Sequence, residues 1–123
     1  MIFKENNKAI YLQIADKICD DVVLGTYVPG QRLPSVREFA ASVQVNANTV
    51  MRSYEYLSSL GVIYNKRGIG FFVADDACGR ITDMRRKSFL DNELPEFFHQ
   101  LRLLGFDSDT LKDMYQKYCD NHK

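Results

Sequence analysis

Four short stretches within residues 33–73 decide the fold of this 123-residue chain: LPSVREFA at 33–40, VNANTV at 45–50, GVI at 61–63 and RGIG at 67–70. The first two are typical of two short helices joined by a tight turn. The last two belong to a β-hairpin whose tip carries a basic residue and glycines. Together they predict a winged helix-turn-helix, a shape that suits the major groove of DNA and its flank. Double-stranded DNA is therefore the expected partner.

The helix expected over about residues 36–42 has a clear start signal. Ser35 follows Pro34, and Glu38 lies three residues after Ser35, so hydroxyl and carboxylate can satisfy each other's helix-end amides as a capping box. Residues 43–45 are expected to make the turn.

Asn46 can cap the next helix, which Gly61 ends. Its apolar residues recur at helical spacing, at positions 50, 54, 57 and 60. β-prone runs at 62–65 and 71–73 then predict the two strands of a hairpin, the wing.

The segment before this motif predicts an amphipathic helix over residues 10–24, stopped by Gly25 and followed by a turn at 27–30. Its apolar positions are Tyr11, Ile14, Ala15, Ile18 and Val22.

The segment after residue 75 predicts two or three helices, with a break or kink near Leu94 because Pro95 fits poorly inside a helix. Two apolar stripes follow: Leu94, Phe97, Phe98, Leu101 and Leu104, then, after a cap at Asp107 or Ser108, Leu111, Met114, Tyr115 and Tyr118. A tail of about 45 residues cannot enclose its own core. These stripes must pack on the N-terminal domain, on a second copy, or on both, and homodimerisation is the economical choice.

The expected fold class is mainly α with a small β-hairpin. We expect a winged helix-turn-helix DNA-binding domain at residues 1–75 and a helical dimerisation tail at 76–123. Hydrophobic residues make up 46% of the chain and charged residues 26%, as in an ordinary globular protein.

The chain has no run of about 18 apolar residues, and residues 1–6 lack the features of a signal peptide, so we expect a cytoplasmic protein without a membrane partner. Three distant cysteines, Cys19, Cys78 and Cys119, suggest reduced thiols. His99 and His122 lack metal-ligand spacing, and no hydrolase or phosphate-loop motif occurs. We therefore expect no enzyme, no metal and no cofactor.

Charge is unevenly distributed although the formal net charge is zero. Residues 32–70 include five basic and two acidic residues, a net charge of +3. Residues 74–123 include eight basic and ten acidic residues, a net charge of −2. This asymmetry separates an expected DNA face from an expected partner-binding tail.

The ordered set of motifs resembles the GntR family of bacterial transcription regulators, and the short tail resembles its YtrA-like subgroup. The resemblance covers residues 9–73 and rests on IYLQI at 10–14, PGQRLPS at 29–35, Arg37-Glu38, NANTV at 46–50 and RGIG at 67–70. It implies a dimer on a palindromic operator, usually a repressor released by a small molecule, often linked to transporter operons. Ala47 and Met51 depart from common family residues, so the operator sequence is not inherited.

Nine residues are the expected DNA contacts. Arg37, which the resemblance favours most, can pair with guanine or phosphate, unless it forms an intramolecular salt bridge. Asn46, Asn48 and Thr49 begin the second helix, where they can meet the DNA backbone or base edges, although Asn46 is as well explained by capping. The full set is Arg32, Ser35, Arg37, Asn46, Asn48, Thr49, Arg52, Arg67 and Gly68.

The remaining members each have an alternative. Arg52 shares a face with Asn48 and suits a phosphate or groove contact, or it is a solvated surface arginine. Arg67 can enter the minor groove, while Gly68 lets the backbone approach the sugar-phosphate. Arg32 can contact phosphate, or serve helix packing or an ion pair with Glu55.

Two rival functions remain open at this point. A winged helix can serve as a protein-interaction module, although the basic wing and Arg37 argue against that. The chain can also be a redox or small-molecule sensor, with aromatic residues of the tail lining a pocket, but aromatic stripes at helical spacing are more often core or interface.

Overall fold

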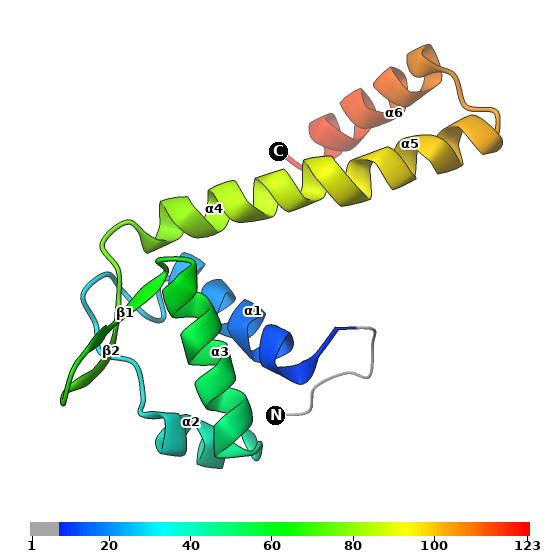
Figure 1. The fold of residues 1–123 in the computed structure, drawn as a ribbon. Helices are drawn as coiled ribbons and strands as arrows, with labels where there is room; N and C mark the ends of the chain where they lie inside the picture. The colour runs from blue at the N-terminus through cyan, green and yellow to red at the C-terminus, as the bar shows by residue number, and fades with distance from the viewer. Residues whose placement is uncertain (1–7) are drawn as a thin grey trace. The chain divides into compact units, whose positions relative to one another are not determined.

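The computed structural model describes residues 8–123, and Figure 1 shows its fold. The chain forms two compact units, Met1–Asp83 and Met84–Lys123, which we describe separately. Residues 1–6, from which we argued against a signal peptide, lie outside the described part. None of the helices described is long and apolar enough to cross a membrane.

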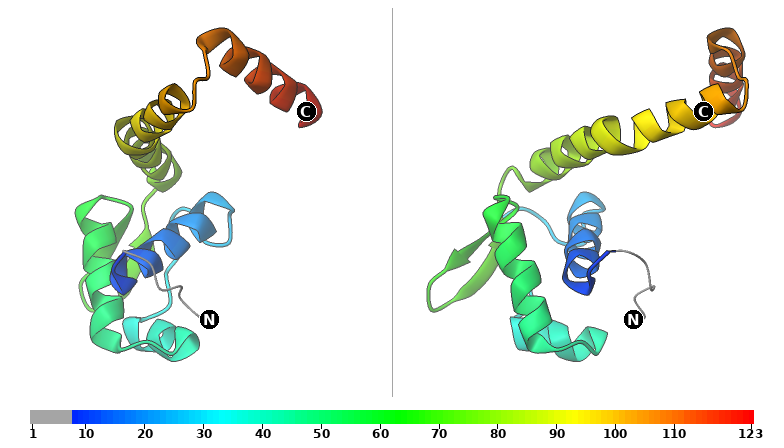
Figure 2. Two further views of the ribbon diagram at one scale, coloured as in Figure 1. Left: turned by 90° about the vertical axis from the view of Figure 1, so that its right-hand side faces the viewer. Right: turned by 45° about the vertical axis from the view of Figure 1, so that its right-hand side comes forward.

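The first unit is a three-helix domain with a two-stranded antiparallel sheet, and it confirms the predicted winged helix-turn-helix (Figures 1 and 2). Its elements in chain order are α1 (Ile10–Val23), α2 (Val36–Val43), α3 (Ala47–Ser59), β1 (Ile63–Lys66) and β2 (Gly70–Val73), followed by the first turns of α4 (Ala77–Ser88).

The core of this unit forms where the apolar faces of α1 and α3 meet. Ile14, Ile18, Val50 and Leu57 are all 0% exposed. Ala77 and Ile81 of α4 are equally buried and belong to the same core cluster. The start of α4 therefore packs with the first unit, while the predicted functional division after residue 75 stays a prediction.

Tyr54 is the largest fully buried side chain of this core and joins α3 to the segment before α2. Its hydroxyl donates a hydrogen bond of 2.7 Å to the Pro34 carbonyl. Its ring makes edge contacts with Phe39 and Phe71, on α2 and β2. Burial raises the pKa of the hydroxyl, which stays a proton donor. One side chain thus ties both helices of the motif to the wing.

Replacing Tyr54 by phenylalanine is expected to lower the free energy of unfolding by about 1–2 kcal/mol, because the Pro34 carbonyl loses its buried donor. Chemical denaturation would measure the loss. Tyr56→Phe is the matched control, since the Tyr56 hydroxyl has no hydrogen-bond partner among residues 8–123. Equal stability of the two variants would show that the Tyr54 hydrogen bond does not hold the motif together.

The ends of α2 and α3 follow the predicted local signals. The Ser35 hydroxyl accepts a 3.1 Å hydrogen bond from the Glu38 amide, and the Glu38 carboxylate accepts one of 3.3 Å from the Ser35 amide. Hydrogen bonding to the Ser35 side chain, and then to its amide, lowers the pKa of Glu38. Gln44 makes the turn with a φ of +57°.

The hairpin pairs Ile63 with Val73, Tyr64 with Phe72, Asn65 with Phe71 and Lys66 with Gly70. An isolated bridge between Arg32 and Phe72 attaches the segment before α2 to the outer side of β2. The turn closes with a 2.9 Å hydrogen bond from the Ile69 amide to the Lys66 carbonyl. Gly68 stands at its third position with a φ of +80°, which a type II turn requires there.

The second unit contains the end of α4, a π-helical segment η1 (Phe89–Glu93), α5 (Leu94–Leu103) and α6 (Ser108–Asn121). The interruption expected near Leu94 is this π-helical turn, and residues 77–103 stay helical throughout. Pro95 lacks an amide hydrogen, and its ring crowds the carbonyl four residues earlier, which a wider turn relieves. Asp107 caps α6 by accepting a 2.7 Å hydrogen bond from the Thr110 amide.

Candidate nucleic-acid interface

Arg37 stands in the first turn of α2, between the two residues of the capping box, and its side chain is exposed. Within the described part of the chain it forms no ion pair, so the alternative of an internal salt bridge has no support there. The Ser35 hydroxyl oxygen is engaged by the Glu38 amide. In the folded chain the Ser35 hydroxyl thus serves the cap of α2.

The start of α3 presents Asn46, Asn48 and Thr49. The Asn46 side-chain oxygen accepts a 2.7 Å hydrogen bond from the Asn48 amide, so Asn46 is a helix cap. The Asn48 side chain is exposed, whereas Thr49 is half-buried. Asn48 is thus the member of this group whose amide group is most available for a base edge or a phosphate.

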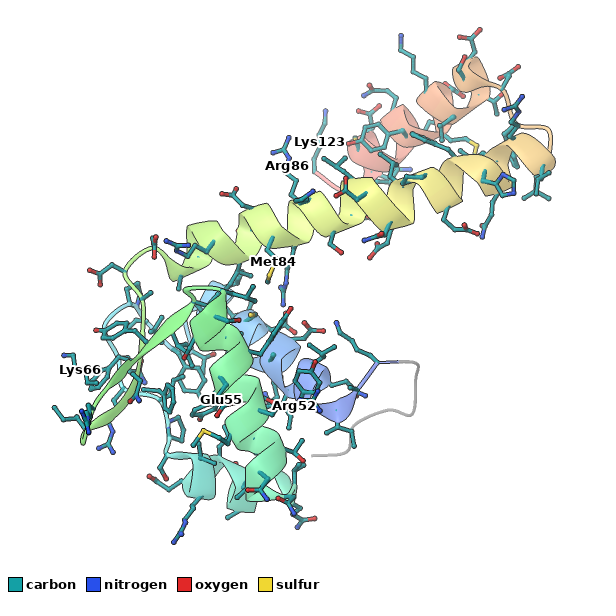
Figure 3. All side chains as sticks on the ribbon, viewed as in Figure 1. Arg52, Glu55, Lys66, Met84, Arg86 and Lys123 are labelled. Atoms are coloured by element: carbon teal, nitrogen blue, oxygen red, sulfur yellow. The ribbon has the colours of Figure 1, made fainter. Side chains whose placement is uncertain are left out.

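Arg52 lies one turn further along α3, and its guanidinium sits over the Tyr11 ring of α1, 4.0 Å from the ring centre (Figure 3). Asn48, Thr49 and Arg52 line one hollow of about 460 Å³ together with Ala9, Ile10 and Tyr11. The predicted contacts on α3 therefore share one surface with the start of α1.

The wing carries basic residues at its tip and aromatic residues on its strands. Arg67 and Gly68 are exposed in the turn. The Lys66 ammonium lies 4.5 Å from the centre of the Phe72 ring, which stacks against Tyr64. Lys66 is labelled on the hairpin in Figure 3. The hairpin tip projects away from α3 in Figure 1 and in the right-hand view of Figure 2, and neither Arg67 nor Gly68 lines the hollow on α3.

Arg32 is exposed beside β2, and its guanidinium lies against Gly70. Its positive charge lowers the pKa of Glu38, less strongly than the hydrogen bonds to Ser35 do. The structure shows no ion pair between Arg32 and Glu55, two residues that it describes fully. Arg32 therefore links the wing to the start of α2.

Gly70→Ala is expected to lower the free energy of unfolding by roughly 1–3 kcal/mol, because Gly70 has a φ of +144° that favours glycine. A Cβ there would also stand 2.9 Å from the Arg32 Nε and displace that side chain. Thermal unfolding would measure the first effect, and titration with DNA the second.

Gly79→Ala is the matched control for Gly70→Ala. Gly79 lies within α4, and a Cβ there meets nothing within 4 Å. Alanine should therefore leave the protein unchanged or slightly more stable. A Gly70→Ala variant that is as stable as this control and binds DNA unchanged would contradict the prediction. It would show that the close contact between Gly70 and Arg32 matters neither for stability nor for DNA binding.

Sequence reasoning did not select Tyr11 as part of this surface. The apolar spacing of the first helix assigned it to the buried face, but Tyr11 is only half-buried and contacts Arg52. No pattern within either helix reveals the pairing, because the two residues belong to different helices that meet only in the folded domain.

The family model described as "Bacterial regulatory proteins, gntR family" matches residues 10–73, which include α1 through β2. The chain belongs to the GntR family. It is 37% identical over 116 residues to the uncharacterized regulator YhcF of Bacillus subtilis, covering 94% of each chain. It is 38% identical over 104 residues to the repressor YtrA of the same organism, covering 85% of this chain and 79% of YtrA.

Solved structures of GntR proteins have the same fold. A transcriptional regulator of the family from Bacteroides thetaiotaomicron is 54% identical, with a TM-score of 0.83, covering 94% of this chain and 100% of that one. The N-terminal domain of AraR, solved in complex with mutant ORR3, is 28% identical, with a TM-score of 0.54 over 57% of this chain and 100% of that one. The protein is a DNA-binding transcriptional regulator of the GntR family, and its relatives are regulators as well.

Proposed function

We propose that the protein is a homodimeric repressor that binds a palindromic operator through residues 1–75 and dimerises through residues 76–123. The observation that carries the proposal is a winged helix-turn-helix with exposed basic side chains on α2, α3 and the wing. Two copies of α3 would occupy successive major grooves, about 34–36 Å apart.

The nine predicted residues have distinct roles in this proposal. Arg37 and Asn48 read base edges or hold phosphates, and Arg67 enters the minor groove with the backbone of Gly68 beside it. The others position the protein on the DNA backbone, or cap the helices that do so: Arg32, Ser35, Asn46, Thr49 and Arg52.

The dimer contact is proposed from an apolar groove within the second unit. This groove of about 990 Å³ is lined mainly by apolar and aromatic side chains of η1, α5 and α6. Phe97 and Phe98 are about half exposed there, and this unit buries none of its side chains completely. Large apolar side chains at such exposure indicate an interface, and a second copy offers the same surface in two-fold symmetry.

The proposed sign of regulation rests on one relative, and the proposed target rests on the resemblance to the YtrA-like subgroup. YtrA, the Bacillus subtilis relative, is named a repressor. We extend repression to this protein, together with release by a small molecule and control of a nearby operon, such as one for an ABC transporter. A genome neighbourhood with a transporter operon beside the gene would support the target.

Selection of bound duplexes from a random DNA pool, followed by titration of the winning duplex at several salt concentrations, tests the function. The expected result is an enriched palindrome whose affinity falls steeply with salt, because bound lysines and arginines displace counterions from phosphates. A reporter gene behind that palindrome should be silenced by the protein. Failure to enrich any sequence would favour the protein-interaction alternative, and an enriched site without two-fold symmetry would contradict the dimer.

A further inference from the structure

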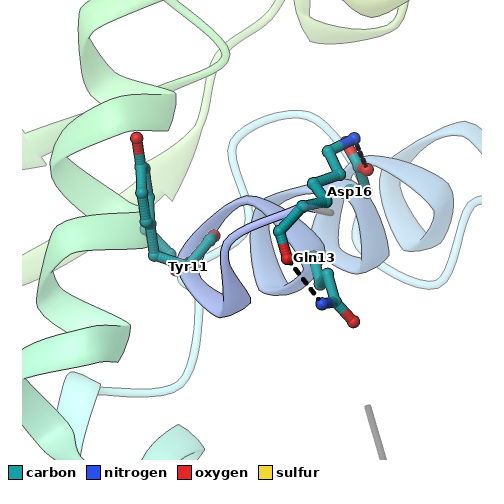
Figure 4. A network of polar contacts seen from close by, with 5 residues as sticks. Tyr11, Gln13 and Asp16 are labelled. Carbon is teal, nitrogen blue, oxygen red and sulfur yellow. Dashed lines mark hydrogen bonds and ion pairs between the residues drawn. The ribbon is translucent and has the colours of Figure 1, made fainter. Parts of the chain in front are cut away.

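Tyr11 and Arg52 form a pair that joins the start of α1 to the surface of α3. The guanidinium carbon of Arg52 lies 4.0 Å from the centre of the Tyr11 ring, within the range of a cation–π interaction. In Figure 4 the Tyr11 side chain points from α1 toward α3. Arg52 makes no ion pair within the described residues, so the ring is the partner that orients its charge there.

Tyr11 is itself held in place from several sides. The Ser53 hydroxyl, which is fully buried, donates a 2.7 Å hydrogen bond to the Tyr11 carbonyl. The ring edge meets the Tyr56 ring, with centres 6.1 Å apart and planes at 87°. Ser53 and Tyr56 both belong to α3, so backbone and ring of Tyr11 are fixed on the same helix that carries Arg52.

The first turn of α1 is also anchored. The Gln13 side-chain amide donates a 2.9 Å hydrogen bond to the Lys8 carbonyl, and the Lys8 ammonium forms an ion pair with Asp16 (Figure 4). These contacts tie together the first turns of α1, the helix that carries Tyr11.

The pair borders a concave surface that other donors share. Asn48 and Thr49 line the same hollow as Tyr11 and Arg52. Residues with a guanidinium, an amide and a hydroxyl line one concave surface, and such donors match the acceptor oxygens of a phosphate group.

We propose that Tyr11 is a positioning residue, which holds the Arg52 guanidinium so that it binds a phosphodiester oxygen of the DNA backbone. This inference rests on the proposed function. Stacking on the ring restricts a long, flexible side chain before DNA arrives, so less conformational freedom is lost on binding. Tyr11 touches Arg52, and only Arg52 touches the phosphate.

The experiment compares the full-length protein with Tyr11→Leu, Tyr11→Phe, Arg52→Ala and the double variant Tyr11→Leu/Arg52→Ala. The probes are the duplex enriched in the selection and a random-sequence duplex of the same length. Affinities are measured at several salt concentrations, and circular dichroism with thermal unfolding checks that each variant is folded.

Tyr11→Leu should weaken binding by about two- to fivefold, the size of an exposed cation–π interaction, while Tyr11→Phe should bind like the wild type because it keeps the ring. Both duplexes should be affected equally, since a backbone phosphate carries no sequence information. Arg52→Ala should also flatten the salt dependence by about one unit of slope for each protomer. Once Arg52 is alanine, the additional Tyr11→Leu change should have no effect.

Three results would overturn the inference: wild-type affinity of Tyr11→Leu, an effect of Tyr11→Leu that persists in the Arg52→Ala background, or weakening confined to the selected duplex. If Tyr11→Leu fails to fold, the remaining variants are used for the test. In that case Arg52→Ala must weaken both duplexes equally and flatten the salt dependence. Failure of the wild type to bind either duplex would instead contradict the proposed function.

Discussion

Replacing Phe97 by glutamate is expected to convert the protein into a monomer and to weaken its binding to a palindromic operator by about 10²- to 10⁴-fold. Phe97 lies on α5, is 46% exposed and lines the apolar groove of the second unit. If that groove is covered by a second copy, the new carboxylate is buried without a partner, at a cost that the interface cannot offset.

The loss of DNA affinity follows from the loss of the dimer. A dimer that has bound one half-site holds its second recognition helix at high effective concentration near the other half-site. A monomer must bind each half-site independently. Light scattering or native mass spectrometry would give the oligomeric state, and titration with the full palindrome and with a single half-site would separate the two effects.

Gln100→Glu is the matched control for Phe97→Glu. It adds a negative charge to the same helix at an exposed position that does not line the groove. It should leave the protein dimeric and its affinity for the palindrome nearly unchanged. A Phe97→Glu protein that stays dimeric would contradict this groove as the interface, and a monomer with full affinity would contradict the need for two protomers.

Arg37→Ala is expected to reduce operator affinity by roughly 1–3 kcal/mol per half-site, about 5- to 150-fold, without changing the stability of the fold. The side chain is exposed at the start of α2 and forms no ion pair among residues 8–123. Its removal should therefore eliminate the proposed contact with DNA and no ion pair within the domain.

Titrations of the selected palindrome and of its single-base variants would measure this effect and identify the contact. If Arg37 reads a guanine, the alanine variant should lose discrimination at one base pair and keep most of its salt dependence. If Arg37 holds a phosphate, affinity for all sequences should fall together, and the salt slope should decrease by about one per half-site.

Lys117→Ala provides the control for charge alone. Lys117 lies on α6 and pairs with Asp113, so its loss removes one positive charge from the second unit. DNA affinity should be nearly unchanged. An Arg37→Ala protein that binds every duplex as tightly as this control would remove Arg37 from the interface.

The capping box at Ser35, the Asn46 cap, the glycine of the wing turn and the helix stop at Gly61 are all local signals, and each was predicted from a few neighbouring residues. The same is true of the helix-turn-helix and its hairpin. Pro95 also predicted a disturbance, although its form was not predictable, because a helix can absorb a proline by a kink, a break or a wider turn.

The sequence by itself determined most helices and strands of this protein and its family, and it selected the basic residues that we propose to contact DNA, because caps, turns and apolar periodicity act over a few residues. Only the tertiary structure decided which side chains support those bases. Tyr11 lies under Arg52, and Gly70 lies against Arg32, across distances along the chain that no local pattern spans. Ile81 likewise joined the core of the first unit. Such contacts depend on how helices pack, since the partners meet only when the core has formed.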